Sequence, residues 1–210
     1  MGEMHSNSLI IAQSRSGGTV VCKLMQKYYR IPYLGEYFNK SIERFDLQER
    51  IGMFKSPAIV KASYNDLKDC FDNVMDLGFD NIYHMYRSDP VGMVCSSFLS
   101  SITGVYHIYT KTETHSPVTD AVMDKEFVEW FFAKENPGGW YYNNPKNIPF
   151  LKDVDYIPLV YNDSSTQESL LEQVIHKKIN LDVNLKKLYK DKSKAIKNLD
   201  QVKEWVNHYV

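Results

Sequence analysis

Near its beginning the chain reads Leu9-Ile10-Ile11-Ala12-Gln13-Ser14-Arg15-Ser16-Gly17-Gly18-Thr19-Val20-Val21. An apolar run is followed by a short Ser/Gly segment with one arginine, and apolar residues then continue at helical spacing through Leu24 and Tyr28. This pattern predicts a buried strand, a tight loop and a helix whose N-terminus faces the loop. The free N–H groups and partial positive charge at such a helix end suit a phosphate or a sulfate group.

The residues of this loop have properties that an anion site uses. Gly17 and Gly18 let the backbone approach an anion closely. Ser16 and Thr19 carry hydroxyl donors, and Arg15 adds a full positive charge. Short Gly/Ser motifs also occur often by chance, so a plain strand-to-helix turn that binds nothing is the alternative interpretation.

Further along the chain, segments of strand and helix character alternate. We expect strands over 58–63, 82–86 and 155–161, the last at an edge or terminal position because it contains a proline. Between the first two we expect one helix with an apolar face, which Gly78 ends; that face is formed by Leu67, Cys70, Phe71, Val74 and Leu77. Such alternation predicts an α/β fold with a doubly wound parallel sheet flanked by helices. Ligands of such sheets bind beyond the carboxyl ends of the strands, where both Arg15 and Arg87 are expected to lie.

The length and charge of the chain limit its organisation and its partners. The 210 residues suffice for a single domain over 1–210, in which 186–210 is a basic C-terminal tail and helix. The net charge is −1, so nothing general attracts the chain to nucleic acid or to an anionic membrane. Any anion site must therefore be local.

Cysteine usage and the absence of targeting segments favour a cytoplasmic protein. Cys22, Cys70 and Cys95 are odd in number, lack CxxC spacing and follow apolar helical patterns, which favours reduced core thiols. Residues 1–7 do not resemble a signal peptide, and no apolar run reaches the length of a membrane span. We therefore expect neither secretion nor membrane insertion.

Two segments together point to a known family. The loop lacks the lysine and the second glycine spacing of the nucleoside-triphosphate motif G-x-x-x-x-G-K-S/T. The segment 15–19 instead resembles the phosphosulfate-binding loop of sulfotransferases, P-K/R-S-G-S/T-T. The segment 86–91, followed by Ser96, is similar to their second motif, which holds the 3′-phosphate of the donor 3′-phosphoadenosine 5′-phosphosulfate.

The resemblance continues in order along most of the chain. Gly35-Glu36-Tyr37-Phe38 resembles the Q-E-Y-F segment of the bacterial trehalose sulfotransferase group, whose glutamate is the proposed catalytic base. Three later segments resemble the W-x-x-F-F, Y-E-D-L and I-x-N-x-x-E-V features; they are Trp130-Phe131-Phe132, Tyr161-Asn162-Asp163 and 196–202. Each motif is weak alone, and their shared order carries the resemblance.

The resemblance implies a single-domain, P-loop-like sulfotransferase fold and a transfer of a sulfuryl group to an acceptor hydroxyl, on a carbohydrate or a glycolipid. Glu36 would be the base, and Arg15 would offset charge on the leaving adenosine 3′,5′-bisphosphate. The 5′-phosphosulfate would be held by Arg15, Ser16, Gly17, Gly18 and Thr19, and the 3′-phosphate by Arg87 and Ser96. The reaction requires no metal.

Departures from the family pattern leave alternatives open. Ser14 replaces a proline, Gly18 a Ser/Thr and Asn162 a glutamate. The interval from Arg87 to Ser96 is one residue longer than usual, so Ser97 is a further candidate for the 3′-phosphate. A nucleotide-dependent small-molecule kinase and a non-catalytic nucleotide-binding module with the same fold are therefore alternatives.

Other side chains compete for the same roles. His84 or His107 could be the base in place of Glu36, since other sulfotransferases use histidine. Lys61 could face the site or solvent. One tail lysine could reach the donor's phosphate, although a solvated charge run is the simpler interpretation; these lysines are at 186, 187, 190, 192, 194 and 197. The acceptor and the oligomeric state are open, with a homodimer among the states allowed.

Overall fold

A parallel sheet forms the centre of the protein. The computed structural model describes residues 7–13, 15–39, 47–105, 118–135, 148–162, 167–175 and 192–210. Four strands within these residues pair in the order β2-β1-β3-β4, with every pair parallel; they are β1 (Asn7–Ala12), β2 (Ile59–Ala62), β3 (Phe79–Arg87) and β4 (Ile157–Tyr161). The α/β fold with a parallel sheet is confirmed.

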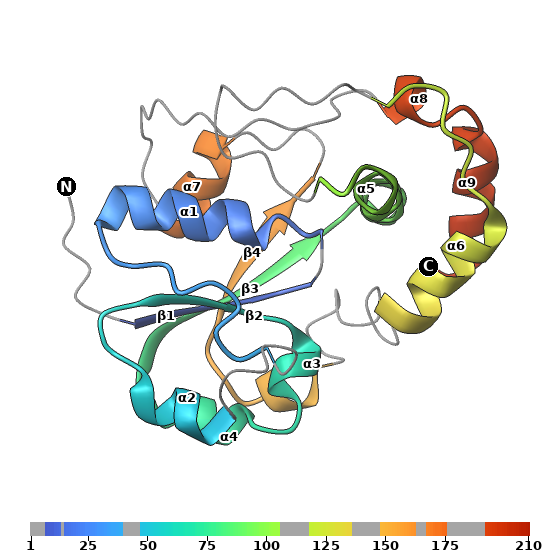
Figure 1. Cartoon of the computed structure of the whole chain (residues 1–210). Helices are drawn as coiled ribbons and strands as arrows, with labels where there is room; N and C mark the ends of the chain where they lie inside the picture. Colours follow the sequence, from blue (N-terminus) through green and yellow to red (C-terminus); the bar gives the residue numbers. More distant parts are fainter. Residues whose placement is uncertain are drawn as a thin grey trace.

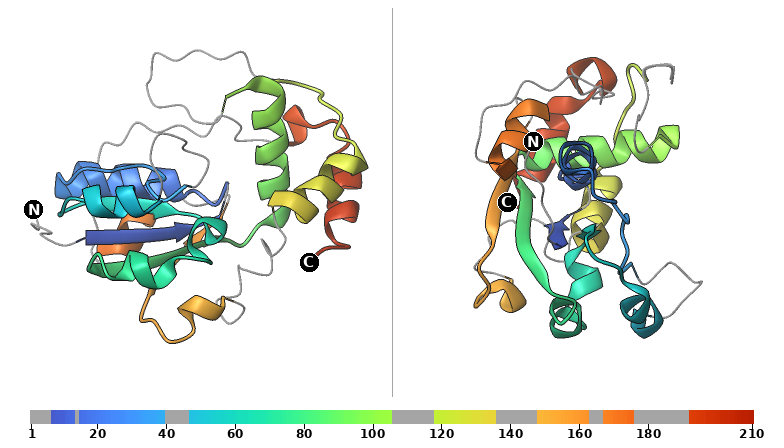
Figure 2. Two further views of the ribbon diagram at one scale, coloured as in Figure 1. Left: turned by 60° about the horizontal axis from the view of Figure 1, so that its bottom comes forward. Right: turned by 90° about the vertical axis from the view of Figure 1, so that its left-hand side faces the viewer.

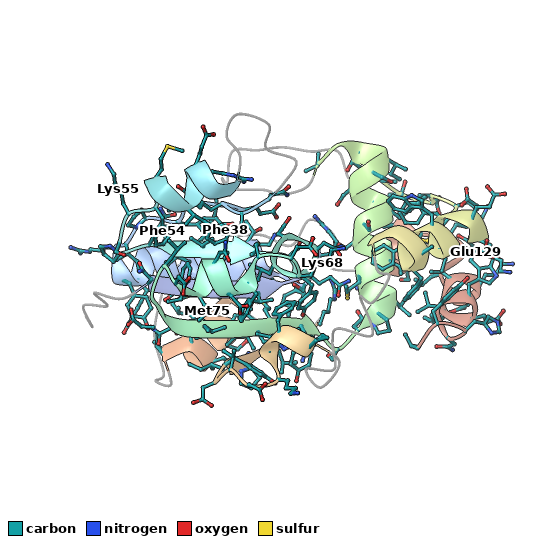
Figure 3. The ribbon with its side chains drawn as sticks, turned by 90° about the horizontal axis from the view of Figure 1, so that it is seen from below. Phe38, Phe54, Lys55, Lys68, Met75 and Glu129 are labelled. Atoms are coloured by element: carbon teal, nitrogen blue, oxygen red, sulfur yellow. The ribbon has the colours of Figure 1, made fainter. Side chains whose placement is uncertain are left out.

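Helices cover both faces of this sheet, as a doubly wound arrangement requires (Figure 1). One face carries α1 (Gly18–Tyr29) and α7 (Gln167–Ile175). The opposite face carries the shorter helices α2 (Leu47–Met53), α3 (Tyr64–Leu67) and α4 (Phe71–Met75), together with the 3-10 turn η4 (Pro149–Leu151). Figure 3 views this second face, where Phe38, Phe54 and Met75 lie against the sheet.

A further group of helices lies beyond the carboxyl ends of the strands (Figures 1 and 2). It consists of α5 (Pro90–Thr103), α6 (Lys125–Trp130), the π-helical turn η1 (Phe131–Glu135), α8 (Lys192–Ala195) and α9 (Leu199–Val206). These helices share their own hydrophobic cluster, in which Val94 and Phe98 of α5 pack with Val202 and Val206 of α9. This cluster joins α5 to α6, η1, α8 and α9.

Strand β1 is buried on both sides because it lies between two other strands and two helical layers. Leu9 and Ile11 belong to the hydrophobic cluster of one face, and Ile10 and Ala12 to that of the other. A strand covered in this way has a continuous apolar sequence, which explains the run at 9–12. The loop that follows β1 is therefore attached to a fully buried strand inside the sheet.

The structure corrects one element and extends another. The single helix expected before Gly78 is wrong, because the segment forms α3 and α4, separated at 68–70. Strand β3 begins at Phe79, three residues before the expected start. The edge position of the proline-containing strand is confirmed, since β4 pairs only with β3 among the described strands. Residues 40–46, 106–117, 136–147 and 176–191, which hold several expected loops and part of the tail, lie outside the described residues.

Two further expectations concern the cysteines and the membrane. Cys22, Cys70 and Cys95 are buried thiols that form no disulfide, as expected for core cysteines. Burial raises the pKa of the Cys22 thiol to about 12, so it stays protonated and unreactive near neutral pH. Among the helices of the described ranges, none has the length and apolar character that crossing a bilayer requires.

Substituting Gly18 with alanine is expected to lower the free energy of unfolding by about 1–3 kcal/mol, because the new methyl group would overpack the start of α1. A Cβ at Gly18 would lie 2.6 Å from the Cβ of Ala12, which is fixed in β1. Urea denaturation measures the change. Gly52→Ala is the matched control, since no described atom lies within 4 Å of its Cβ position and alanine favours a helix. Equal midpoints for the two variants would contradict this packing argument.

Candidate functional site

The loop between β1 and α1 has a backbone shape that brings it close to the neighbouring strands. Arg15 has φ 63° and Gly17 has φ 87°, so both residues are left-handed. A Cβ at Gly17 would lie 3.0 Å from Met85 Cε and 3.1 Å from Tyr161 Cδ2. Glycine is therefore required at 17, both by the backbone and by contact with β3 and β4.

Ser16 stabilises this loop from within. Its side chain is fully buried, its Oγ donates to the Gln13 carbonyl at 2.6 Å, and its N–H donates to the same oxygen at 3.2 Å. The Ser16 hydroxyl, which we predicted as a donor to an anion, therefore already donates a hydrogen bond within the loop. Thr19 follows in the first turn of α1, which begins at Gly18.

Arg87, the last residue of β3, meets this loop. Its side chain is 4% exposed, and its Nη1 donates to the backbone carbonyl of Arg15 at 3.3 Å. The guanidinium carbon also lies 5.0 Å from the ring centre of Tyr161, in cation–π geometry. The β1–α1 loop and the end of β3 each carry one of these arginines, 72 residues apart in sequence. The two segments are therefore in direct contact at one edge of the sheet.

The Arg15 side chain extends toward α5. Its Nε and Nη2 donate to Ser96 Oγ at 3.0 and 2.7 Å. The sequence assigned Ser96 to the same phosphate as Arg87, whereas the structure places it against Arg15. The three residues still form one group. Arg87 contacts the backbone carbonyl of Arg15, and Ser96 contacts the Arg15 side chain.

A carboxylate and a lysine complete the group around Arg87. Asp89 caps α5, since its Oδ1 accepts from the N–H of Gly92 at 2.7 Å. Its Oδ2 lies 3.4 Å from Arg87 Nη2 and 3.2 Å from Nζ of Lys192. A Cβ at Gly92 would collide with all three side chains, so glycine permits this close packing. Among the lysines of the tail, Lys192 thus reaches the second motif, across 103 residues of sequence.

Lys61 connects Glu36 to the first turn of α1. Lys61 Nζ is 2.5 Å from Glu36 Oε1 and 3.4 Å from Thr19 Oγ1. The Glu36 side chain is 44% exposed, and Asn39 donates to its second oxygen at 3.1 Å. A partly exposed carboxylate next to a candidate anion loop has the position that a general base for an incoming hydroxyl requires.

The segment that carries Glu36 is fixed by a residue that the sequence did not single out. Arg50, a buried arginine of α2, donates from Nη1 to the carbonyls of Tyr37 and Asn39 at 2.8 and 2.7 Å. Tyr37 Oη donates in return to the Arg50 carbonyl at 2.8 Å. Nothing in the local sequence could have indicated this clamp, because it joins helix α2 to a separate loop through backbone oxygens.

Comparison with protein-family models, with curated proteins and with solved structures gives no match for this chain. The functional interpretation therefore depends on the charges and geometry of the strand edge.

Positive charge is concentrated at this edge. Four cationic side chains meet two carboxylates there; the cations are Arg15, Lys61, Arg87 and Lys192, and the acids are Glu36 and Asp89. The chain as a whole has a net charge of −1, so this excess is local. Together with the N-terminus of α1, it favours a ligand with more than one anionic group.

His84 lies on the other face of the sheet. Alternation along β3 directs Arg87 toward α1 and His84 toward α3, where His84 is fully buried. Its Nε2 is 2.5 Å from the hydroxyl of Tyr64, and its ring stacks on Tyr86. His84 therefore does not join the group around Arg15, and His107 lies outside the described residues.

Proposed function

We propose that the protein is a sulfotransferase with a P-loop-like sulfotransferase fold. It would transfer a sulfuryl group from 3′-phosphoadenosine 5′-phosphosulfate to a hydroxyl of a carbohydrate or glycolipid acceptor. One observation carries the proposal: Arg87 Nη1 lies 3.3 Å from the Arg15 carbonyl, so the two arginine motifs form one site. A donor with anionic groups at both ends of its ribose needs two such cationic positions close together.

The described side chains fit the roles that an in-line transfer requires. Glu36 would accept the proton of the acceptor hydroxyl while that oxygen attacks sulfur and the bond from sulfur to the phosphate oxygen breaks. Arg15 would stabilise the charge that develops on the departing phosphate. Arg87, with Lys192 beside it, would hold the 3′-phosphate, and positioning supplies much of the rate, as in phosphoryl transfer.

A nucleotide-dependent kinase is the second candidate, because one contact is equally compatible with it. The loop sequence lacks the lysine of a nucleoside-triphosphate site, yet Lys61 places an ammonium 3.4 Å from the Thr19 hydroxyl. The same contact serves either donor, so nucleotide preference has to separate the two reactions.

Titration calorimetry with adenosine 3′,5′-bisphosphate, ATP and ADP is expected to show at least about tenfold tighter binding of the bisphosphate. A single additional charge-assisted contact to the 3′-phosphate is worth this much. Adenosine without phosphate is the control for binding of the base and sugar. A preference for ATP would contradict the sulfotransferase proposal and support the kinase.

A further inference from the structure

Lys61 is a buried lysine in a strand, a costly position for an ammonium group. Its side chain is 9% exposed, and it is the buried lysine of the described part of the chain. Removing an ammonium from water costs several kcal/mol unless partners compensate. The partners recorded among the described residues are the oxygens of Glu36 and Thr19, while the ammonium has three N–H donors.

The sheet register directs this side chain to the start of α1. Lys61 pairs with Ile10 of β1 and lies on the face that α1 covers. Its Cδ and Cε would each be 3.4 Å from a Cβ at Gly18, so its stem runs directly beneath the first residue of the helix. These distances are ordinary van der Waals contacts, so the Lys61 stem packs against the start of α1.

We propose that Lys61 supplies from β2 the ammonium group that the β1–α1 loop lacks, in addition to the guanidinium of Arg15, and that it binds the 5′-phosphate end of the nucleotide at the start of α1. The inference depends on the proposed function for the identity of the nucleotide only, because sulfate and phosphate esters at this position present the same anionic oxygens. Lys61 also holds Glu36, so one ammonium connects the phosphate end of the donor to the carboxylate that would accept the proton.

The test compares Lys61→Met with the wild type by calorimetry, using nucleotides that differ in one phosphate. We expect Lys61→Met to bind adenosine 3′,5′-bisphosphate and adenosine 5′-phosphate roughly 10- to 100-fold more weakly, the value of a charge-assisted contact. Adenosine 3′-phosphate should bind both proteins within about twofold, since its 5′ end carries no charge. Lys68→Met, an exposed lysine on the face seen in Figure 3, is the matched control and should leave all three affinities unchanged.

The outcomes separate this inference from the proposed function. Equal affinities of the wild type and Lys61→Met for the 5′-phosphates would overturn the role of Lys61, and so would an equal loss for adenosine 3′-phosphate. If the wild type prefers ATP, only the sulfotransferase proposal is overturned. The role of Lys61 is then tested by comparing the affinities of the wild type and Lys61→Met for ATP, with adenosine as the control. A wild type that binds none of these nucleotides would overturn both. Urea denaturation checks that the variant is folded, and Lys61→Gln, a second uncharged variant with a polar end, repeats the test.

Discussion

Replacing Arg87 with methionine is expected to lower the affinity for adenosine 3′,5′-bisphosphate by roughly 100-fold and to remove the preference for it over adenosine 5′-phosphate. The guanidinium is 4% exposed, and charge-assisted contacts in such surroundings are strong because little water screens them. Asp89 keeps Lys192 as a partner in the variant, so this half-buried carboxylate is not left without a cation. Calorimetry with the two nucleotides measures both quantities.

The control for this variant is Arg30→Met. Arg30 is an exposed arginine that ends α1, at the end of the helix opposite to the loop, so its removal changes the same net charge without touching the site. If Arg87→Met retained the wild-type ratio of the two affinities, Arg87 would not be the residue that recognises the 3′-phosphate.

Glu36→Gln is expected to reduce turnover by roughly 10²- to 10⁴-fold, the usual contribution of a general base, while the bisphosphate still binds with nearly wild-type affinity. The amide keeps the shape of the carboxylate and an oxygen that can face Lys61, but it cannot accept the proton of the attacking hydroxyl. Release of adenosine 3′,5′-bisphosphate with a panel of sugars and glycolipids measures turnover.

Glu129→Gln controls for a general loss of negative charge, because Glu129 lies on α6, away from the strand edge (Figure 3). Undiminished turnover in Glu36→Gln would show that Glu36 is not the base. Reduced affinity for the bisphosphate together with reduced turnover would instead indicate that Glu36 acts by arranging the donor loop through Lys61.

The sequence predicted the parallel sheet because its strands depend on local patterns. The apolar run before Arg15 predicted a buried strand, which β1 forms. The single helix expected before Gly78 was wrong for a local reason. Ser63 and Asp66 form a capping box that starts α3, and Cys70, with φ −146°, interrupts the helix and begins α4. The apolar positions remained buried because both short helices face the same cluster.

The pairings within the site could not be predicted, because they join residues that only the tertiary fold brings together. Lys61 faces α1 through the register of β2 on β1, which no local pattern encodes. The contacts of Ser96 with Arg15 and of Lys192 with Asp89 span 81 and 103 residues. Sequence motifs therefore show which charged and polar side chains are available, and the order of the strands decides which of these side chains come into contact.

The three strands that bear the site, β1, β2 and β3, are adjacent in the sheet although they come from separate parts of the first 87 residues. The nucleotide of the proposed function would bind between them in the folded chain only, so its binding free energy would add to that of folding. At a concentration of 100 times its dissociation constant, such a nucleotide would contribute about 2.7 kcal/mol against unfolding. In a protein of ordinary marginal stability, the substrate would act as part of the scaffold that holds the first half of the chain together.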